Sequence, residues 1–97
     1  MAIDQNDSTA MSNLADILYN GEYGIESDKE NAIKYYKMSA KLGNLDAMNK
    51  YGIILRDGNG HRVDKKKALR YFKQASEKGH LEATNNYNSL LQLEKET

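Results

Sequence analysis

An internal repeat limits the folds open to this chain. Residues 30–47 and 66–83 carry the same pattern at a constant offset of 36 residues. The identical pairs are Ala32/Ala68, Tyr35/Tyr71, Lys37/Lys73, Gly43/Gly79, Leu45/Leu81 and Ala47/Ala83. Most other positions are similar, as in Tyr36 against Phe72. A period near 36 with apolar residues at helical spacing indicates stacked helix pairs, since each pair buries its apolar face only against its neighbours.

The repeated unit is predicted to be an A helix followed by a B helix, each of about 14 residues. Small and aromatic residues share one face of the B helix, and the small ones allow a neighbouring helix to approach closely. Asp28 and Asp64 precede the B helices as N-caps, although Ser27 is an alternative cap for the first. Gly43 and Gly79 are expected to end these helices in the left-handed conformation.

The A helix occurs three times. Its apolar faces are Ala10, Leu14, Ile17 and Leu18; Ala47, Tyr51, Ile54 and Leu55; and Ala83, Tyr87, Leu90 and Leu91. The order A-B-A-B-A predicts an all-α fold, a superhelical solenoid of antiparallel helix pairs with about five helices. A single domain is expected over residues 1–97, with repeat one at about 8–43, repeat two at about 44–79 and a final A helix at about 80–94.

Composition argues against several kinds of partner. Lys+Arg and Asp+Glu number 14 each, so no net charge attracts nucleic acid or an anionic membrane. No apolar run is long enough to span a bilayer, and the N-terminus lacks the regions of a signal peptide. The chain has no cysteine, so neither disulfides nor thiol chemistry are expected. These features favour a cytoplasmic protein. Five of the seven tyrosines lie at core phases rather than forming a base-stacking surface, namely Tyr35, Tyr36, Tyr51, Tyr71 and Tyr87.

No motif predicts an enzyme, a metal site or a cofactor site. His61 and His80 have no partner at metal-ligand spacing, and a polar role at a turn and at a helix start is expected for them. None of the common hydrolase, metalloprotease or phosphate-loop patterns occurs. Residues 65–67 read Lys-Lys-Lys at the start of a helix, where positive charge opposes the helix dipole. A solvated face and a partner-binding patch are both open readings of this run.

The pattern resembles the Sel-one-like repeat, a relative of the tetratricopeptide repeat with a longer glycine-rich loop. The positions that carry the resemblance in the first copy are Leu18, Tyr19, Gly21, Gly24, Ile25, Asp28, Ala32, Tyr35, Tyr36, Ser39, Ala40, Gly43, Asn44 and Ala47. Those in the second copy are Gly58, Gly60, Val63, Asp64, Ala68, Tyr71, Phe72, Gly79, His80 and Ala83. The resemblance covers roughly residues 8–93. It implies a scaffold or adaptor that binds a protein or peptide, commonly through a concave surface lined by A helices.

Three rows of A-helix residues are the expected binding surface, because they lie outside the core phases. The rows are Ser12, Asn49 and Asn85; Asp16, Ile53 and Ser89; and Tyr19, Arg56 and Gln92. Ile53 and Tyr19 would be apolar anchors, and Arg56 would pair with a carboxylate of the partner. The alternative function is an oligomerising fragment of a longer array, since the last A helix has no B helix after it. One side of Leu90 or Leu93 should then stay open for association with a second copy.

Overall fold

The computed structural model describes residues 5–96 and contains five α-helices in this range, with no strand. The helices are α1 (Gln5–Asn20), α2 (Lys29–Lys41), α3 (Leu45–Asp57), α4 (Lys65–Glu77) and α5 (Leu81–Glu96). The A helices of the sequence pattern are α1, α3 and α5, and the B helices are α2 and α4. The expected all-α fold and helix order are therefore confirmed.

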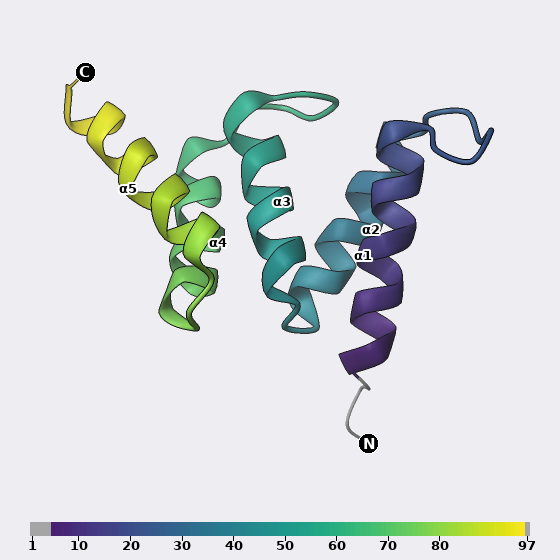
Figure 1. The fold of residues 1–97 in the computed structure, drawn as a ribbon. Helices are drawn as coiled ribbons and strands as arrows, with labels where there is room; N and C mark the ends of the chain where they lie inside the picture. Colours follow the sequence, from purple (N-terminus) through teal and green to yellow (C-terminus); the bar gives the residue numbers. More distant parts are fainter. Residues whose placement is uncertain (1–4, 97) are drawn as a thin grey trace.

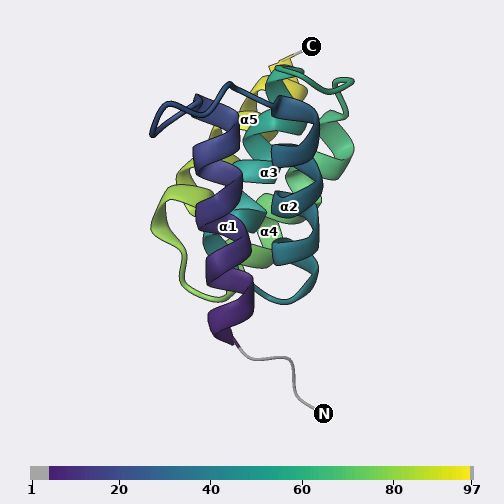
Figure 2. The same ribbon diagram turned by 90° about the vertical axis from the view of Figure 1, so that its right-hand side faces the viewer.

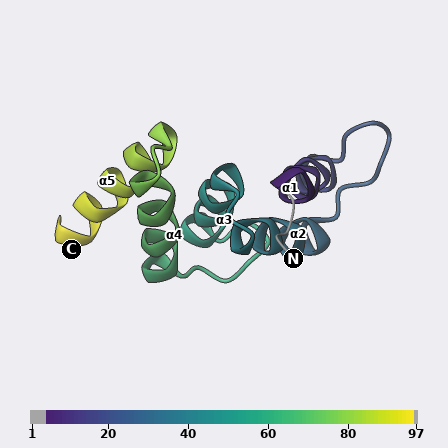
Figure 3. The same cartoon turned by 90° about the horizontal axis from the view of Figure 1, so that it is seen from below.

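The helices run up and down in chain order across the molecule, so that the two ends of the chain lie at opposite ends of the array (Figure 1). Each helix packs against the next, and Figure 2 shows α1 and α2 side by side in front of the later helices. Seen from below, α1 and α3 lie toward one side of the array and α2 and α4 toward the other (Figure 3). The extents are 41 × 32 × 19 Å, which is the shape of a short slab rather than a sphere.

The helix ends follow the repeat. Asp28 is the N-cap of α2, because its side chain accepts the Asn31 N–H at 3.1 Å, and Asp64 caps α4 in the same way. Ser27, the alternative cap, donates its hydroxyl to the Tyr19 carbonyl instead, at 3.0 Å. Gly43 and Gly79 follow the B helices with φ of 98° and 95°, a conformation in which a Cβ would be strained.

The core lies where the B helices meet the A helices. Tyr51, Leu55 and Phe72 are at most 1 % exposed, and Ala68 is fully buried. At Gly52 an added Cβ would lie 2.6 Å from Cε1 of Phe72, so glycine is required there by the close approach of α3 and α4. Small and aromatic residues of the two repeats thus pack as the periodicity predicts.

Each A–B loop is fastened to the helix before it by the same backbone hydrogen bond. The Asp28 N–H donates to the Leu18 carbonyl at 2.7 Å, and the Asp64 N–H donates to the Leu55 carbonyl at 2.8 Å. The loop of residues 21–28 is one residue longer than the loop of residues 58–64, yet both return to the equivalent carbonyl. The length difference is absorbed inside the loop, as expected for a surface segment.

The ends of the array differ from the expected pattern. Ala10 and Leu14 were assigned to the core, but Ala10 is exposed and Leu14 is 39 % exposed. The equivalent residues of α3, Ala47 and Tyr51, are buried, because α3 has neighbouring helices on both sides. Of the two α5 residues expected to stay open, Leu93 is 57 % exposed. Leu90 is only 1 % exposed and belongs to the core.

Candidate functional site

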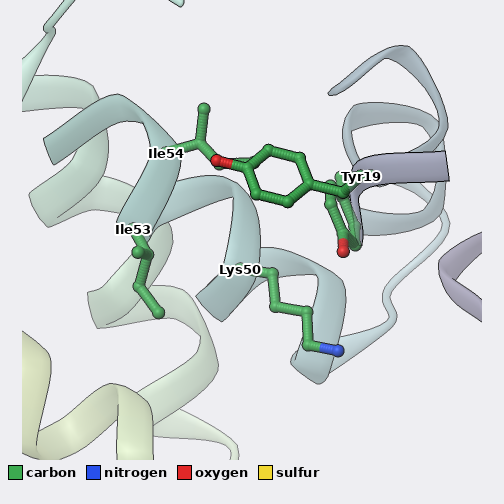
Figure 4. A pocket seen from close by; sticks show the side chains of 5 residues that line it. Tyr19, Lys50, Ile53 and Ile54 are labelled. Atoms are coloured by element: carbon green, nitrogen blue, oxygen red, sulfur yellow. The ribbon is translucent and has the colours of Figure 1, made fainter. Parts of the chain in front are cut away.

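Two of the predicted binding residues line one surface hollow. Tyr19 at the end of α1 and Ile53 on α3 surround a volume of about 120 Å³ together with Tyr36, Lys50 and Ile54. Figure 4 shows the Tyr19 ring extending across the hollow toward Ile54. The lining is mostly apolar, with the Lys50 ammonium as its one charged group. A hollow of this size admits a small apolar side chain of a partner.

The Tyr19 ring is held in place from several sides. Its hydroxyl donates to the Asn59 carbonyl at 3.1 Å, which connects α1 to the loop of the second repeat. The Lys29 ammonium lies 5.2 Å from the ring centroid and donates to the Asn59 side-chain oxygen at 2.8 Å. Burial raises the pKa of Tyr19, and the negative charge of Asp57 adds to this effect. The ring is therefore a fixed, uncharged wall of the hollow at neutral pH.

Asp16, another predicted binding residue, joins three helices under the hollow. Its Oδ1 accepts from the Tyr36 hydroxyl of α2 and from the Lys50 ammonium of α3, the latter at 2.6 Å. Burial raises the pKa of Tyr36 far above its ordinary value, and the hydrogen bond to the Asp16 carboxylate raises it further. Asp16 is thus used within the chain, where it positions Lys50 and Tyr36.

Arg56 also has a partner within the chain. Its Nε lies 2.8 Å from Asp57 Oδ1, and a terminal guanidinium nitrogen lies 3.0 Å from Oδ2. This hydrogen bond lowers the pKa of Asp57 and raises that of Arg56. The expected role of Arg56, pairing with a partner's carboxylate, would require this exposed pair to open. The cost is small, because exposed ion pairs contribute little.

The first predicted row needs a correction. Ser12 is 5 % exposed and Asn49 is 2 % exposed, so neither side chain reaches the surface. Asn49 Oδ1 accepts a hydrogen bond from the Asn86 amide of α5 at 2.8 Å, which satisfies a buried polar group between successive A helices. The row lies outside the core phases, and helix phase alone does not show that an amide pair is buried between α3 and α5.

The predicted residues on α5 lie at the surface, apart from the hollow. Asn85, Ser89 and Gln92 are exposed, and the Gln92 amide donates to Glu96 at 3.1 Å. The structure therefore brings Tyr19 and Ile53 together and leaves the α5 residues as a separate surface. The prediction omitted Lys50 and Ile54, although Lys50 lies one helical turn before both isoleucines and so shares their side of α3.

Neither histidine lies in a metal-binding cluster. Within residues 5–96, no group of three or more His, Cys, Asp or Glu side chains is arranged to hold a metal ion. His80 instead caps α5, because its Nδ1 accepts the Ala83 N–H at 3.0 Å. The helices of the described range also include none with the length and hydrophobicity needed to cross a membrane.

The stacked A and B helices, with their matching caps and loop anchors, define an α-solenoid repeat protein. The Sel1 repeat model matches residues 8–44 and 45–80, and the chain belongs to the Sel1 repeat family. This result confirms the resemblance seen in the sequence. The Sel1 repeat fold is typical of protein-interaction scaffolds, and Sel1 repeat proteins are generally non-catalytic and generally mediate protein–protein contacts.

Two solved structures show the same architecture. A Sel1 repeat protein from Oxalobacter formigenes is 27% identical with a TM-score of 0.76, and the match covers 88% of this chain and 34% of that chain. A protective antigen of uropathogenic Escherichia coli, c5321, which displays an SLR fold, is 33% identical with a TM-score of 0.72, covering 78% of this chain and 16% of that one. The chain thus spans about a third or less of these relatives. A search of curated protein sequences gives no match.

Proposed function

We propose that the chain is a protein-interaction module that binds a partner protein or peptide on the concave face lined by its A helices. The hollow between α1 and α3 would receive an apolar side chain of the partner. The observation that carries this proposal is that Tyr19 and Ile53, which come from successive A helices, line the same open volume. Apolar anchors seated in such a volume supply much of the binding free energy in protein interfaces.

The surroundings of the hollow support a rigid receptor. Tyr19 is fixed by Asn59 and Lys29, and Lys50 is fixed by Asp16. Side chains that are already ordered lose little conformational entropy when a partner binds. The exposed polar residues of α5, Asn85, Ser89 and Gln92, would extend the contact along the same series of helices, with amides and a hydroxyl that suit a peptide backbone.

A selection from a random peptide library on the immobilised chain tests the proposal. The best peptide is labelled, and its dissociation constant is measured by fluorescence anisotropy for wild type and two variants. Ile53→Asp places a charge in the hollow and should weaken binding at least tenfold, equivalent to about 1.4 kcal/mol. Ile25→Asp is the matched control, because Ile25 is an exposed isoleucine of the loop at residues 21–28.

Circular dichroism must show that both variants keep their helices. Equal affinity for wild type and Ile53→Asp would place the peptide elsewhere on the molecule and end the assignment to the α1–α3 hollow. Equal losses in Ile53→Asp and Ile25→Asp would show a general effect of added negative charge rather than a seat for an apolar side chain.

A second candidate function is self-association through the last helix. Leu93 on α5 is 57 % exposed and Leu81 is 80 % exposed, so apolar surface remains open at this end. Sedimentation velocity over a range of protein concentrations measures the oligomeric state. If the chain self-associates through α5, a dimer should form at high concentration, and Leu93→Glu should dissociate it. A monomer at every concentration would remove it.

A further inference from the structure

The zero net charge of the chain conceals a strong separation of charge. The first 28 residues contain six acidic residues and neither lysine nor arginine. The B helices are the opposite: α2 has four lysines and one glutamate, and α4 has five basic residues and one glutamate. Both B helices lie toward the same side of the array (Figure 3). The molecule therefore has a basic side, even though its overall charge is neutral.

The basic groups recur with the repeat. Lys34 and Lys37 of α2 correspond, at the offset of 36 residues, to Arg70 and Lys73 of α4. We call these four residues the basic face. Three of them are exposed and Lys37 is half-buried, and none forms an ion pair within residues 5–96. Two successive B helices thus present the same pair of cations to solvent.

The cations of the basic face repel one another within each helix. Like charges three residues apart on a helix repel each other, as Lys34 and Lys37 do, and Arg70 and Lys73 do the same. The lysines at 65–67 stand in the first turn of α4, where the helix dipole disfavours positive charge. Repulsion of this kind is relieved when an anionic partner binds.

A hollow borders the part of the basic face that lies on α2. Lys34, Lys37 and His61 line a hollow of about 220 Å³ with Ile33, Gly60 and a single acid, Glu30. The loop of residues 58–64 lies against α2 here, since a Cβ on Gly60 would be 3.2 Å from Cβ of Lys29. The same loop leads directly into Lys65, Lys66 and Lys67 at the start of α4. It therefore joins the hollow beside α2 to the cations of α4.

We propose that the basic face of α2 and α4 binds an acidic peptide segment of a partner protein, with a carboxylate seated between Lys34, Lys37 and His61. A carboxylate matches the ammonium groups of Lys34 and Lys37, which form no ion pair within the described residues, in charge and size. A base-stacking surface for single-stranded nucleic acid would need exposed aromatics, but the aromatic residues of α2 and α4 are buried or half-buried. Insertion into a membrane would need several exposed large apolar groups, and on α2 and α4 only Met38 is of this kind.

The experiment uses a fluorescein-labelled, glutamate-rich peptide and the same peptide with glutamine in place of glutamate. Anisotropy at low and at physiological salt should show that only the glutamate peptide binds and that salt weakens the binding. Lys34→Glu and Arg70→Glu should each weaken it about tenfold. Lys95→Glu on α5 is the matched control, since Lys95 is also an exposed helical lysine and the change in net charge is identical. It should stay within about twofold of wild type.

Several results would overturn the proposal. Equal losses in Lys34→Glu and Lys95→Glu would show that net charge matters and the basic face does not. Tighter binding of a single-stranded oligonucleotide, or of phosphatidylserine vesicles, would assign the face to a different partner. Self-association at low salt that Lys34→Glu abolishes would make a second copy the occupant. Failure of the glutamate peptide to bind at low salt would also end the proposal.

The outcome is independent of the test made on the α1–α3 hollow. Lys34 and Arg70 lie outside that hollow, so either surface can fail while the other holds. If a charge reversal lowers the helix content, Lys34→Gln and Arg70→Gln provide milder variants with the same expected direction. Their effect on the glutamate peptide should be smaller than that of the reversals and still larger than that of Lys95→Gln.

Discussion

His80 at the start of α5 contacts Asp46 at the start of α3, with Nε2 of the ring 2.7 Å from Oδ1 of the carboxylate. The same ring accepts the Ala83 N–H on Nδ1 at 3.0 Å, so Nδ1 carries no proton and Nε2 is the donor to Asp46. In α3 the equivalent cap is Asn44, which accepts the Ala47 N–H at 2.8 Å. His80 thus caps α5 as Asn44 caps α3, and its hydrogen bond to Asp46 also links the two repeats.

This arrangement makes a prediction for His80. His80→Ala removes the cap and the link, and it should lower the free energy of unfolding by about 1–2 kcal/mol. His80→Asn should recover most of the loss, because asparagine already caps α3 in the equivalent place. Urea unfolding followed by circular dichroism measures both. If the alanine and asparagine variants are equally stable, the ring does not act as a cap.

The buried amide pair of Asn49 and Asn86 makes the second prediction. Asn86→Ala leaves the 2 %-exposed Asn49 oxygen without its donor, and the expected loss is about 1–3 kcal/mol of unfolding free energy. Asn85→Ala changes an exposed neighbour on the same helix and should stay within about 0.5 kcal/mol of wild type. Thermal melting of the two alanine variants, made side by side, compares a buried with an exposed amide. Equal melting temperatures would contradict the pairing.

The close approach of α3 and α4 at Gly52 leads to the third prediction. Alanine is a better helix former than glycine, so Gly52→Ala would stabilise an open helix by up to about 1 kcal/mol. Here the new Cβ meets the fully buried Phe72 ring, and we expect a net loss of about 1–3 kcal/mol. Adding Phe72→Leu to Gly52→Ala should cost less than the sum of the two single changes, because the leucine gives the Cβ room. If denaturant unfolding shows that the free-energy losses of the two single changes simply add in the double variant, the strain does not lie between residue 52 and residue 72.

The raised pKa of Tyr36 predicts a dependence of stability on alkaline pH. The folded state keeps the phenol protonated to higher pH than the unfolded chain does, so its contribution is complete below about pH 10 and is lost as pH rises further. Tyr36→Phe should lose about 1–3 kcal/mol at neutral pH, since Asp16 loses a donor but keeps Lys50. The difference between wild type and variant should then narrow above about pH 10. A constant difference up to pH 11 in urea unfolding would contradict the assignment.

The repeat in the sequence was sufficient to predict the helices, their caps and most of the core. The helix-end residues recur at one offset because each has a local role that its own backbone geometry determines. Asp28 and Asp64 cap the N-termini of the B helices, and Gly43 and Gly79 follow their C-termini with positive φ. The helical phase of the apolar residues also predicts that Leu55 and Phe72 lie in the core, and both are fully buried.

The binding surface was predicted less well, because it depends on which neighbours are present. Phase places Leu14 and Tyr51 on equivalent faces, yet only Tyr51 has a helix on each side to cover it. The partners of Asp16 and Asn49 come from residues 20 to 37 positions away, and a polar letter in the sequence does not show whether it is paired within the fold. Tyr19 and Ile53 are the two predicted apolar anchors, and both line the hollow between α1 and α3.

The backbone hydrogen bond from Asp28 to Leu18 is repeated from Asp64 to Leu55. It makes the spacing of the helices independent of the length of the loops that connect them. Because each loop returns to a fixed carbonyl before the next helix begins, residues added or removed between those points leave the stacking of helices unchanged. The segment around Tyr23 is therefore free to diverge in length and chemistry while the helices stay in register. The loop of residues 58–64 is more constrained, because its Asn59 accepts hydrogen bonds from Tyr19 and Lys29. An engineer could graft a foreign peptide at Tyr23, which is 85 % exposed, and keep the spacing of the helices.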